Sequence, residues 1–264
     1  MSSRIEQKFA ALAEKKRKGL ITYVMGGDPD IKASQQIISA VVQAGTDILE
    51  IGMPFSDPMA DGPTIQAAGL RALKAGTKLK DVIALVKNFR KEDDATPVIL
   101  MGYYNPIYSY GIEKFCRDAA EAGIDGVILP DLPPEEENEF IGIAGKHGIR
   151  LIRLIAPTTG DARLAALTKN ADGFLYCIAV TGVTGTHSAD LDSLKKRVTH
   201  IKSQTTLPVA VGFGIKTPQQ AKEIAKFSDA IVVASALVEI LAGGSVQKAC
   251  DFVKSLRQTL DDKQ

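Results

Sequence analysis

In the stretch of sequence from residue 47 to residue 63, three carboxylates follow the strand-opening Asp47 at short spacing. Glu50 lies inside an apolar run of strand length, and Asp57 and Asp61 lie in the loop that follows, which three prolines stiffen. Asp57 stands in a Ser-Asp-Pro sequence, which is typical of a turn. A carboxylate at the end of a buried strand, with others just beyond it, favours general acid-base chemistry.

The rest of the chain alternates apolar, β-branched runs with amphipathic helical stretches. Eight such units in about 250 residues predict a single-domain (β/α)8 barrel, a TIM barrel of the α/β class, over residues 1–264, with an extra N-terminal helix. The alternative is a doubly wound open sheet, but Gly212-Phe-Gly214 lacks the third glycine of a dinucleotide-binding turn. The expected strands are 20–25, 47–51, 97–101, 125–129, 149–155, 173–178, 207–211 and 229–233. The expected helices are 2–18, 31–44, 62–74, 78–91, 111–122, 135–146, 160–169, 190–203, 217–226 and 236–257, the last broken near Gly243-Gly244.

A weak internal repeat supports the barrel. The second, fourth, sixth and eighth strands each open with an aspartate, namely Asp47, Asp125, Asp172 and Asp229. Alternating strand entries fit a barrel whose interior is packed in layers from odd and even strands.

In such a barrel the active site lies at the C-terminal ends of the strands. Glu50 shares one face of its strand with Ile48. An ionised carboxylate under the helix layer would be dry and unpaired, which costs several kcal/mol, so we expect Glu50 to face the barrel mouth. The plainer alternatives are an ion pair for Glu50 and an N-cap role for Asp61 at the helix 62–74.

Glycine-rich turns after the sixth to eighth strands suggest a phosphate site, because backbone N–H groups and helix N-termini bind anions. Gly185, Gly214 and Ser235 are the candidate donors, with simple turn chemistry as the alternative. The loop 179–190 is rich in Gly, Thr and Ser, which suits a lid.

Composition excludes several classes of protein. The net charge of +1 gives no reason to expect nucleic acid or a membrane surface as partner, and the start of the chain lacks the apolar core of a signal peptide. Three scattered cysteines and three histidines lack metal-ligand spacing, so we expect a cytoplasmic protein with reduced thiols and no metal. The serine-hydrolase elbow, the Walker loop and a Schiff-base lysine are missing, apart from Lys216 near a strand end. Metal-free proton transfer by carboxylates on a phosphorylated substrate remains.

The run from Leu49 to Pro63, Leu-Glu-Ile-Gly-Met-Pro-Phe-Ser-Asp-Pro-Met-Ala-Asp-Gly-Pro, resembles the signature of tryptophan synthase alpha chains. Further similar segments lie at 23–29, 101–106, 130–134, 182–185 and 211–215. The resemblance implies cleavage of indole-3-glycerol phosphate to indole and glyceraldehyde 3-phosphate. It implies a partner beta chain that carries pyridoxal phosphate and consumes the indole, in an alpha2beta2 assembly, and no cofactor in this chain. The loops 54–61 and 130–134 and the lid are the candidate partner face.

The resemblance also implies site roles. Glu50 would act as general acid-base, Asp61 would assist at the indole N–H, and Tyr176 would lie by the glycerol part. Gly185, Gly214, Ala234 and Ser235 would hold the phosphate. We expect Tyr23, Leu100, Leu129 and Phe213, near strand ends, to sandwich the indole.

Three places depart from the family, and one of them is Cys177-Ile-Ala179, where a serine-containing run before the lid is usual. Ala234 stands where glycine is usual, which is harmless unless the position needs a positive φ. His187 stands near a usual lid arginine. The competing functions are another phosphosugar barrel enzyme, and a non-catalytic subunit that binds a phosphorylated ligand and regulates a partner chain.

Overall fold

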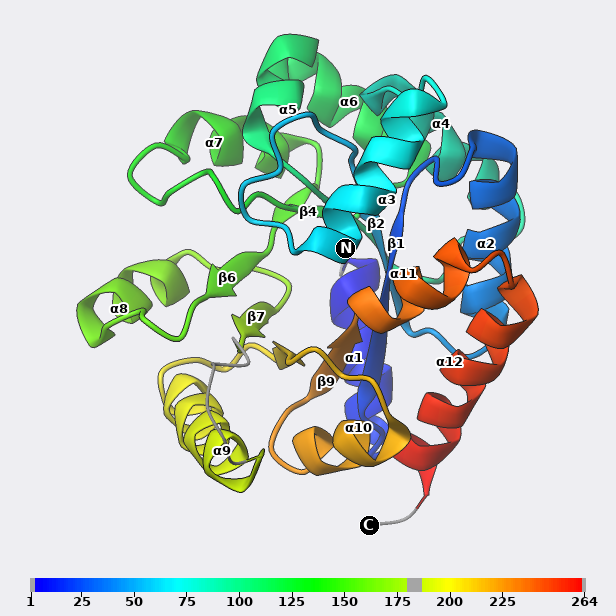
Figure 1. Ribbon diagram of the computed structural model, residues 1–264. Helices are drawn as coiled ribbons and strands as arrows, with labels where there is room; N and C mark the ends of the chain where they lie inside the picture. The colour runs from blue at the N-terminus through cyan, green and yellow to red at the C-terminus, as the bar shows by residue number, and fades with distance from the viewer. Residues whose placement is uncertain (1–2, 180–186, 263–264) are drawn as a thin grey trace.

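The computed structural model describes residues 3–179 and 187–262 (Figure 1). The helices are α1 (Arg4–Glu14), α2 (Ile31–Gln43), α3 (Pro63–Lys74), α4 (Leu79–Phe89), α5 (Tyr104–Tyr110), α6 (Ile112–Ala122), α7 (Asn138–Lys146), α8 (Asp161–Lys169), α9 (His187–Ser203), α10 (Pro218–Ala225), α11 (Ser235–Ala242) and α12 (Val246–Asp261). The strands are β1 (Gly19–Met25), β2 (Ile48–Gly52), β3 (Val98–Met101), β4 (Gly126–Ile128), β5 (Arg150–Leu151), β6 (Arg153–Ile155), β7 (Leu175–Ile178), β8 (Val209–Gly212) and β9 (Ala230–Val233). No helix in these ranges is long and apolar enough to cross a membrane.

The strands form one parallel sheet that closes on itself. Their order is β5-β4-β3-β2-β1-β9-β8-β7-β6. β5 and β6 are two halves of the run 150–155, divided at Ile152; the first half pairs with β4 and the second with β7. This run therefore joins the two ends of the sheet. The predicted α/β barrel is confirmed, and the alternative of a doubly wound open sheet is wrong. All eight predicted strands are present, the fifth in two pieces.

The two faces of the sheet pack into separate cores. Inward-facing side chains such as Ile21, Ile48 and Ile99 form one cluster, and the outward-facing ones pack under the helices. Helix α1 adds Ile5 and Phe9 to the inner cluster, so it closes the end of the barrel where the strands begin. The predicted N-terminal helix is therefore present, and it acts as a plug for the interior.

Most of the strand-entry aspartates have a structural role. Asp47, Asp125 and Asp229 each accept hydrogen bonds from a backbone N–H at the start of a neighbouring strand and from an arginine or lysine. The donors, at 2.6–2.9 Å, are Leu20 and Arg257 for Asp47, Val98 and Arg90 for Asp125, and Val209 and Lys202 for Asp229. Asp172 differs, since it pairs with Arg150 and accepts from Gly173. The repeat thus fastens neighbouring strands together at the N-terminal end of the barrel.

Helix α5 was not predicted, because its glycine and proline neighbours are typical of a loop. Pro106 is the third residue of α5, where no intrahelical N–H bond is needed. Gly111, at φ +92°, ends α5 and opens α6. The predicted C-terminal helix is divided at Gly243-Gly244 as expected, into α11 and α12.

Candidate active site

Glu50 lies on the inner face of the barrel. It follows Ile48 by two residues on β2, and Ile48 belongs to the inner cluster. Its register partners are Tyr23 on β1 and Ile99 on β3. The residue is only 1% exposed, and its Oε2 atom has no hydrogen-bond partner among the described residues. The alternative of an ion-paired Glu50 therefore has no support.

The surroundings of Glu50 favour its neutral form. Burial, and to a lesser degree the carboxylate of Asp61, raise the pKa of Glu50 to about 8. A carboxyl group with this pKa is mostly protonated at neutral pH, so it can donate a proton and later take one back. An ordinary surface glutamate would already be ionised and could not act as the acid.

Asp61 is held by Tyr103 and does not cap a helix. The N-cap of α3 is Gly62, and α3 has no side-chain cap, so the N-cap alternative for Asp61 is wrong. The Tyr103 hydroxyl hydrogen-bonds the Asp61 carboxylate and accepts from the Ala60 N–H at 2.9 Å. Burial raises the pKa of Asp61, and the hydrogen bond from Tyr103 opposes that rise. Tyr103 thus ties the loop after β2 to the end of β3.

Two tyrosines complete the polar part of the interior. Tyr23 and Tyr176 are both buried, and burial raises the pKa of each. The charges of Asp61 and then Glu50 add to the rise for Tyr23, and the charge of Glu50 adds to it for Tyr176. Glycines make room for their hydroxyl groups, since a Cβ at Gly52 would lie 2.0 Å from the Tyr23 oxygen and one at Gly212 would lie 2.8 Å from that of Tyr176. The two phenols and the carboxyl group therefore belong to one enclosed region.

The other three residues expected around the indole lie elsewhere. Leu100 and Leu129 are fully buried or nearly so in the outer cluster, beneath the helices, so the prediction that they face the interior is wrong. Period-two alternation explains this, because Ile99 faces inward and Leu100 must then face outward. Phe213 also packs in the outer cluster, beside a cavity of about 190 Å³ that Leu194 helps to line.

On β3 and β4 the inward positions near the strand ends are Met101 and Ile128, which the sequence reasoning missed. Ile128 belongs to the inner cluster and Met101 packs against it. The two residues are register partners on β3 and β4. Ile99 pairs with the inward-facing Glu50, so Met101, two residues further along β3, must also face inward. Ile128 is the register partner of Met101 and faces the same way. Tyr103 was also missed, since its position after the third strand gives no sign of a bond to Asp61.

The expected phosphate-binding residues lie after β8 and β9. Gly214 has a φ of +61° and open space beside its Cα, and Ser235 is the first residue of the eight-residue helix α11. Ala234 precedes it with a φ of −118°, so the position does not need the positive φ that would call for glycine. Gly185 and most of the expected lid, 180–186, lie outside the described residues. No three metal-ligating side chains gather in the part of the chain that the structure describes.

A buried carboxyl group inside a (β/α)8 barrel, with a second carboxylate near it and backbone donors after the last two strands, defines an acid-base enzyme of the barrel class. A family model described as tryptophan synthase alpha chain matches residues 9–263. The tryptophan synthase alpha subunit of Legionella pneumophila str. Paris is 40% identical, with all of both chains covered and a TM-score of 0.92. The alpha chain from L. pneumophila subsp. pneumophila is 38% identical, with 99% of this chain and 98% of that one covered and a TM-score of 0.91. An aminoacrylate-bound tryptophan synthase from M. tuberculosis is 33% identical, with 98% and 100% covered and a TM-score of 0.90.

The chain belongs to the tryptophan synthase alpha chain family. It is a lyase of tryptophan biosynthesis that cleaves indole-3-glycerol phosphate to indole and glyceraldehyde 3-phosphate.

Proposed function

We propose that Glu50 is the general acid-base of this cleavage and that Asp61 assists it at the indole nitrogen. The observation that carries the proposal is the buried, inward-facing Glu50 carboxyl group, whose pKa is raised to about 8 and whose Oε2 lacks a protein partner. A carboxyl group with no role in catalysis would only destabilise the fold at this position, because burying an unsatisfied polar group is unfavourable.

The chemistry needs two proton transfers. Protonated Glu50 gives its proton to C3 of the indole, which makes the ring an indolenine-like cation. The Asp61 carboxylate stabilises the positive charge that develops at the ring nitrogen. The resulting Glu50 carboxylate takes the proton of the glycerol hydroxyl next to the breaking bond. The bond between indole C3 and the glycerol carbon then breaks, and its electron pair returns to the indole ring. Indole and the aldehyde are released, and Glu50 is protonated again.

The substrate's two ends call for different surroundings. Tyr23, Met101 and Ile128 supply the enclosed walls for the indole, and Tyr176 lies by the glycerol part. Backbone N–H groups at Gly214, Ala234 and Ser235 hold the phosphate, with the N-terminus of α11 adding its dipole. Chain 1–264 forms one barrel domain with the site at the C-terminal ends of its strands.

Indole release from indole-3-glycerol phosphate by the isolated chain tests the proposal. Glu50→Gln keeps the size of the side chain and removes its acid function, so turnover should fall by about 10³-fold or more. Asp57→Asn is the matched control, because Asp57 lies in the same loop as Asp61 but is exposed, and this variant should keep turnover in the isolated chain. Near-normal turnover by Glu50→Gln would refute the role of Glu50.

We further propose that the chain works in the cytoplasm with a beta chain, as alpha2beta2, and that the pyridoxal phosphate belongs to that beta chain. The support is the similarity to the M. tuberculosis tryptophan synthase. The surface near Asp61 fits a partner face, because Met59 is 83% exposed and Tyr108 is 65% exposed. Adding a beta chain to the indole assay should raise the rate of the wild-type chain. A Met59→Asp variant should keep the isolated rate and lose that rise.

A further inference from the structure

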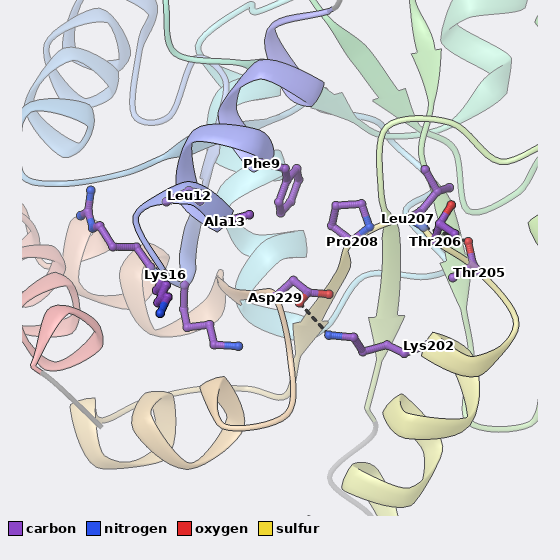
Figure 2. A pocket seen from close by; sticks show the side chains of 12 residues that line it. Phe9, Leu12, Ala13, Lys16, Lys202, Thr205, Thr206, Leu207, Pro208 and Asp229 are labelled. Carbon is purple, nitrogen blue, oxygen red and sulfur yellow. Dashed lines mark hydrogen bonds and ion pairs between the residues drawn. The ribbon is translucent and has the colours of Figure 1, made fainter.

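A second cavity lies at the opposite end of the barrel from Glu50. We call it the lower cavity; it has a volume of about 470 Å³. It lies where helix α1 ends and where strands β1, β8 and β9 begin (Figure 2). Its lining residues are Phe9, Leu12, Ala13, Lys16, Arg17, Lys18, Lys202, Thr205, Thr206, Leu207, Pro208 and Asp229. The volume is within the range of small-molecule sites, about 300–1,000 Å³.

One side of the lower cavity is apolar. Figure 2 shows Phe9 and Pro208 opposite one another, with Leu12 and Ala13 on the same helix as Phe9. Phe9 and Leu12 are buried parts of the barrel plug, so this wall is fixed by the inner core. A rigid apolar wall of this kind binds an aromatic or aliphatic group with little ordering cost.

The other side carries an excess of positive charge. Lys202 pairs with Asp229 at 2.6 Å, while Lys18 donates to the Ser228 carbonyl at 2.7 Å. Asp229 is fully engaged, since its second oxygen accepts the N–H that opens β8. The Lys16 ammonium group has no hydrogen bond or ion pair among the described residues, although its backbone N–H donates to the Ala13 carbonyl. Since Arg17 is neutralised by Asp261, the lower cavity holds three lysines against one aspartate.

The backbone at Lys16 is in an unfavourable conformation. Lys16 has a φ of +51°, and among the described residues no other non-glycine residue has a positive φ. It occupies the position after the α1 C-cap where glycine is usual, and the N–H of Arg17 returns to the Leu12 carbonyl at 2.8 Å. A lysine in this conformation is less favourable than glycine, so replacement by glycine should stabilise the fold.

We propose that the lower cavity binds a small amphipathic anion, a carboxylate or phosphate group attached to an apolar body. The apolar part lies against Phe9 and Pro208, and the anionic group lies among Lys16, Lys18 and Lys202. An anion there complements a cluster of three lysines whose charge a single aspartate, Asp229, compensates only in part. Because the lower cavity is at the strand N-termini, it is separate from the site that cleaves indole-3-glycerol phosphate.

Methyl NMR of the full chain, with labelled alanine and leucine and at low salt, tests this directly. The probes are phenylacetate, phenyl phosphate, inorganic phosphate and benzyl alcohol. The Ala13 and Leu207 methyl signals should shift and saturate with phenylacetate, with phenyl phosphate, or with both, and the stronger of the two shows which anionic group is preferred. Binding should be about tenfold weaker for inorganic phosphate and for benzyl alcohol. The Ala234 methyl signal separately reports occupation of the catalytic phosphate site.

Two variants locate the binding. Ala13→Leu fills the lower cavity and should weaken binding about tenfold, whereas Ala11→Leu, an exposed alanine of the same helix outside the lining, should not change it. Lys16→Gly should weaken binding roughly two- to fivefold and raise the melting temperature by about 2 °C, because the strained conformation is relieved. A weaker binder that is more stable cannot be explained by misfolding.

Several results would overturn the proposal. If inorganic phosphate binds as tightly as phenyl phosphate, the lysines alone account for binding and the apolar wall does not contribute. If benzyl alcohol binds as tightly as phenylacetate, the apolar wall alone accounts for binding and the lysines do not contribute. Shifts confined to Ala234 would place all binding at the catalytic site. Equal affinities for Ala13→Leu and Ala11→Leu, or no Ala13 shift with any probe, would likewise contradict it.

Discussion

Replacing Glu50 with glutamine should make the protein more stable as well as inactive, and the gain should grow with pH. Burial raises the pKa of folded Glu50 to about 8, against 4.5 for an ordinary glutamate. Below pH 4.5 both the folded and the unfolded chain carry a protonated Glu50, and the residue adds no penalty. Between the two pKa values the unfolded chain is ionised and the folded one is not, so folding becomes less favourable as pH rises.

The size of the effect follows from proton linkage. Each pKa unit of difference is worth about 1.4 kcal/mol, so the full penalty above pH 8 is on the order of 5 kcal/mol. Between pH 6 and pH 9 the penalty should grow by roughly 3 kcal/mol. Glutamine does not titrate and avoids this change, although its buried amide without partners costs about 1–3 kcal/mol at every pH.

Urea unfolding of the wild-type chain and of Glu50→Gln, at pH 6 and at pH 9, measures this. The free energy of unfolding of the variant relative to wild type should rise by roughly 3 kcal/mol between the two pH values. Other titrating groups are shared by both proteins and cancel in the difference. A constant difference would mean that Glu50 is ionised at neutral pH in the folded chain, and it could not then be the acid of the reaction.

Three further predictions concern the neighbours of Glu50. Asp61→Asn should lower the rate of indole release by about 10²–10³-fold with a melting temperature within a few degrees of wild type, and a large loss of stability with activity kept would contradict its proposed role. Tyr103→Phe should lower kcat by roughly three- to tenfold, because the Asp61 carboxylate loses its hydrogen bond; an unchanged kcat in the steady-state indole assay would show that Tyr103 does not position it. Leu100→Ala should cost about 2–5 kcal/mol of stability in urea with KM unchanged, whereas Met101→Ala should raise KM; the reverse pattern would put Leu100 on the inner face.

The barrel could be predicted from the sequence because its signal is repeated eight times. Each buried strand reads as an apolar run, and errors at single boundaries do not change the count. What the runs cannot show is how the ring closes. The division of the fifth strand at Ile152, with one half bonded to β4 and the other to β7, depends on partners far apart in the chain. Helix α5 was missed for a local reason: a proline is compatible with a helix only in its first turn, and the sequence does not show that Pro106 falls there.

The site was predictable in part. Glu50 on the inner face follows from alternation and from the cost of burying a charge beneath the helices, and the structure places it there. The same alternation was not applied to the third and fourth strands, so Leu100 and Leu129 were chosen in place of Met101 and Ile128. Tyr103 could not be found from the sequence, because its contact with Asp61 joins two loops that follow different strands.

The buried carboxylates of this barrel differ in whether a cation pairs with them, and this difference supports the proposed chemistry. At the end where strands begin, Asp47, Asp125 and Asp229 each accept a backbone N–H and pair with a cation. At the other end, Glu50 has neither a cation nor a backbone donor among the residues that the structure describes, and Asp61 has the Tyr103 hydroxyl. The fold therefore has the means to satisfy buried carboxylates and leaves these two without them. Groups left in this state gain most from a ligand that brings a proton acceptor and a developing positive charge, which is what protonation and cleavage of the indole ring supply.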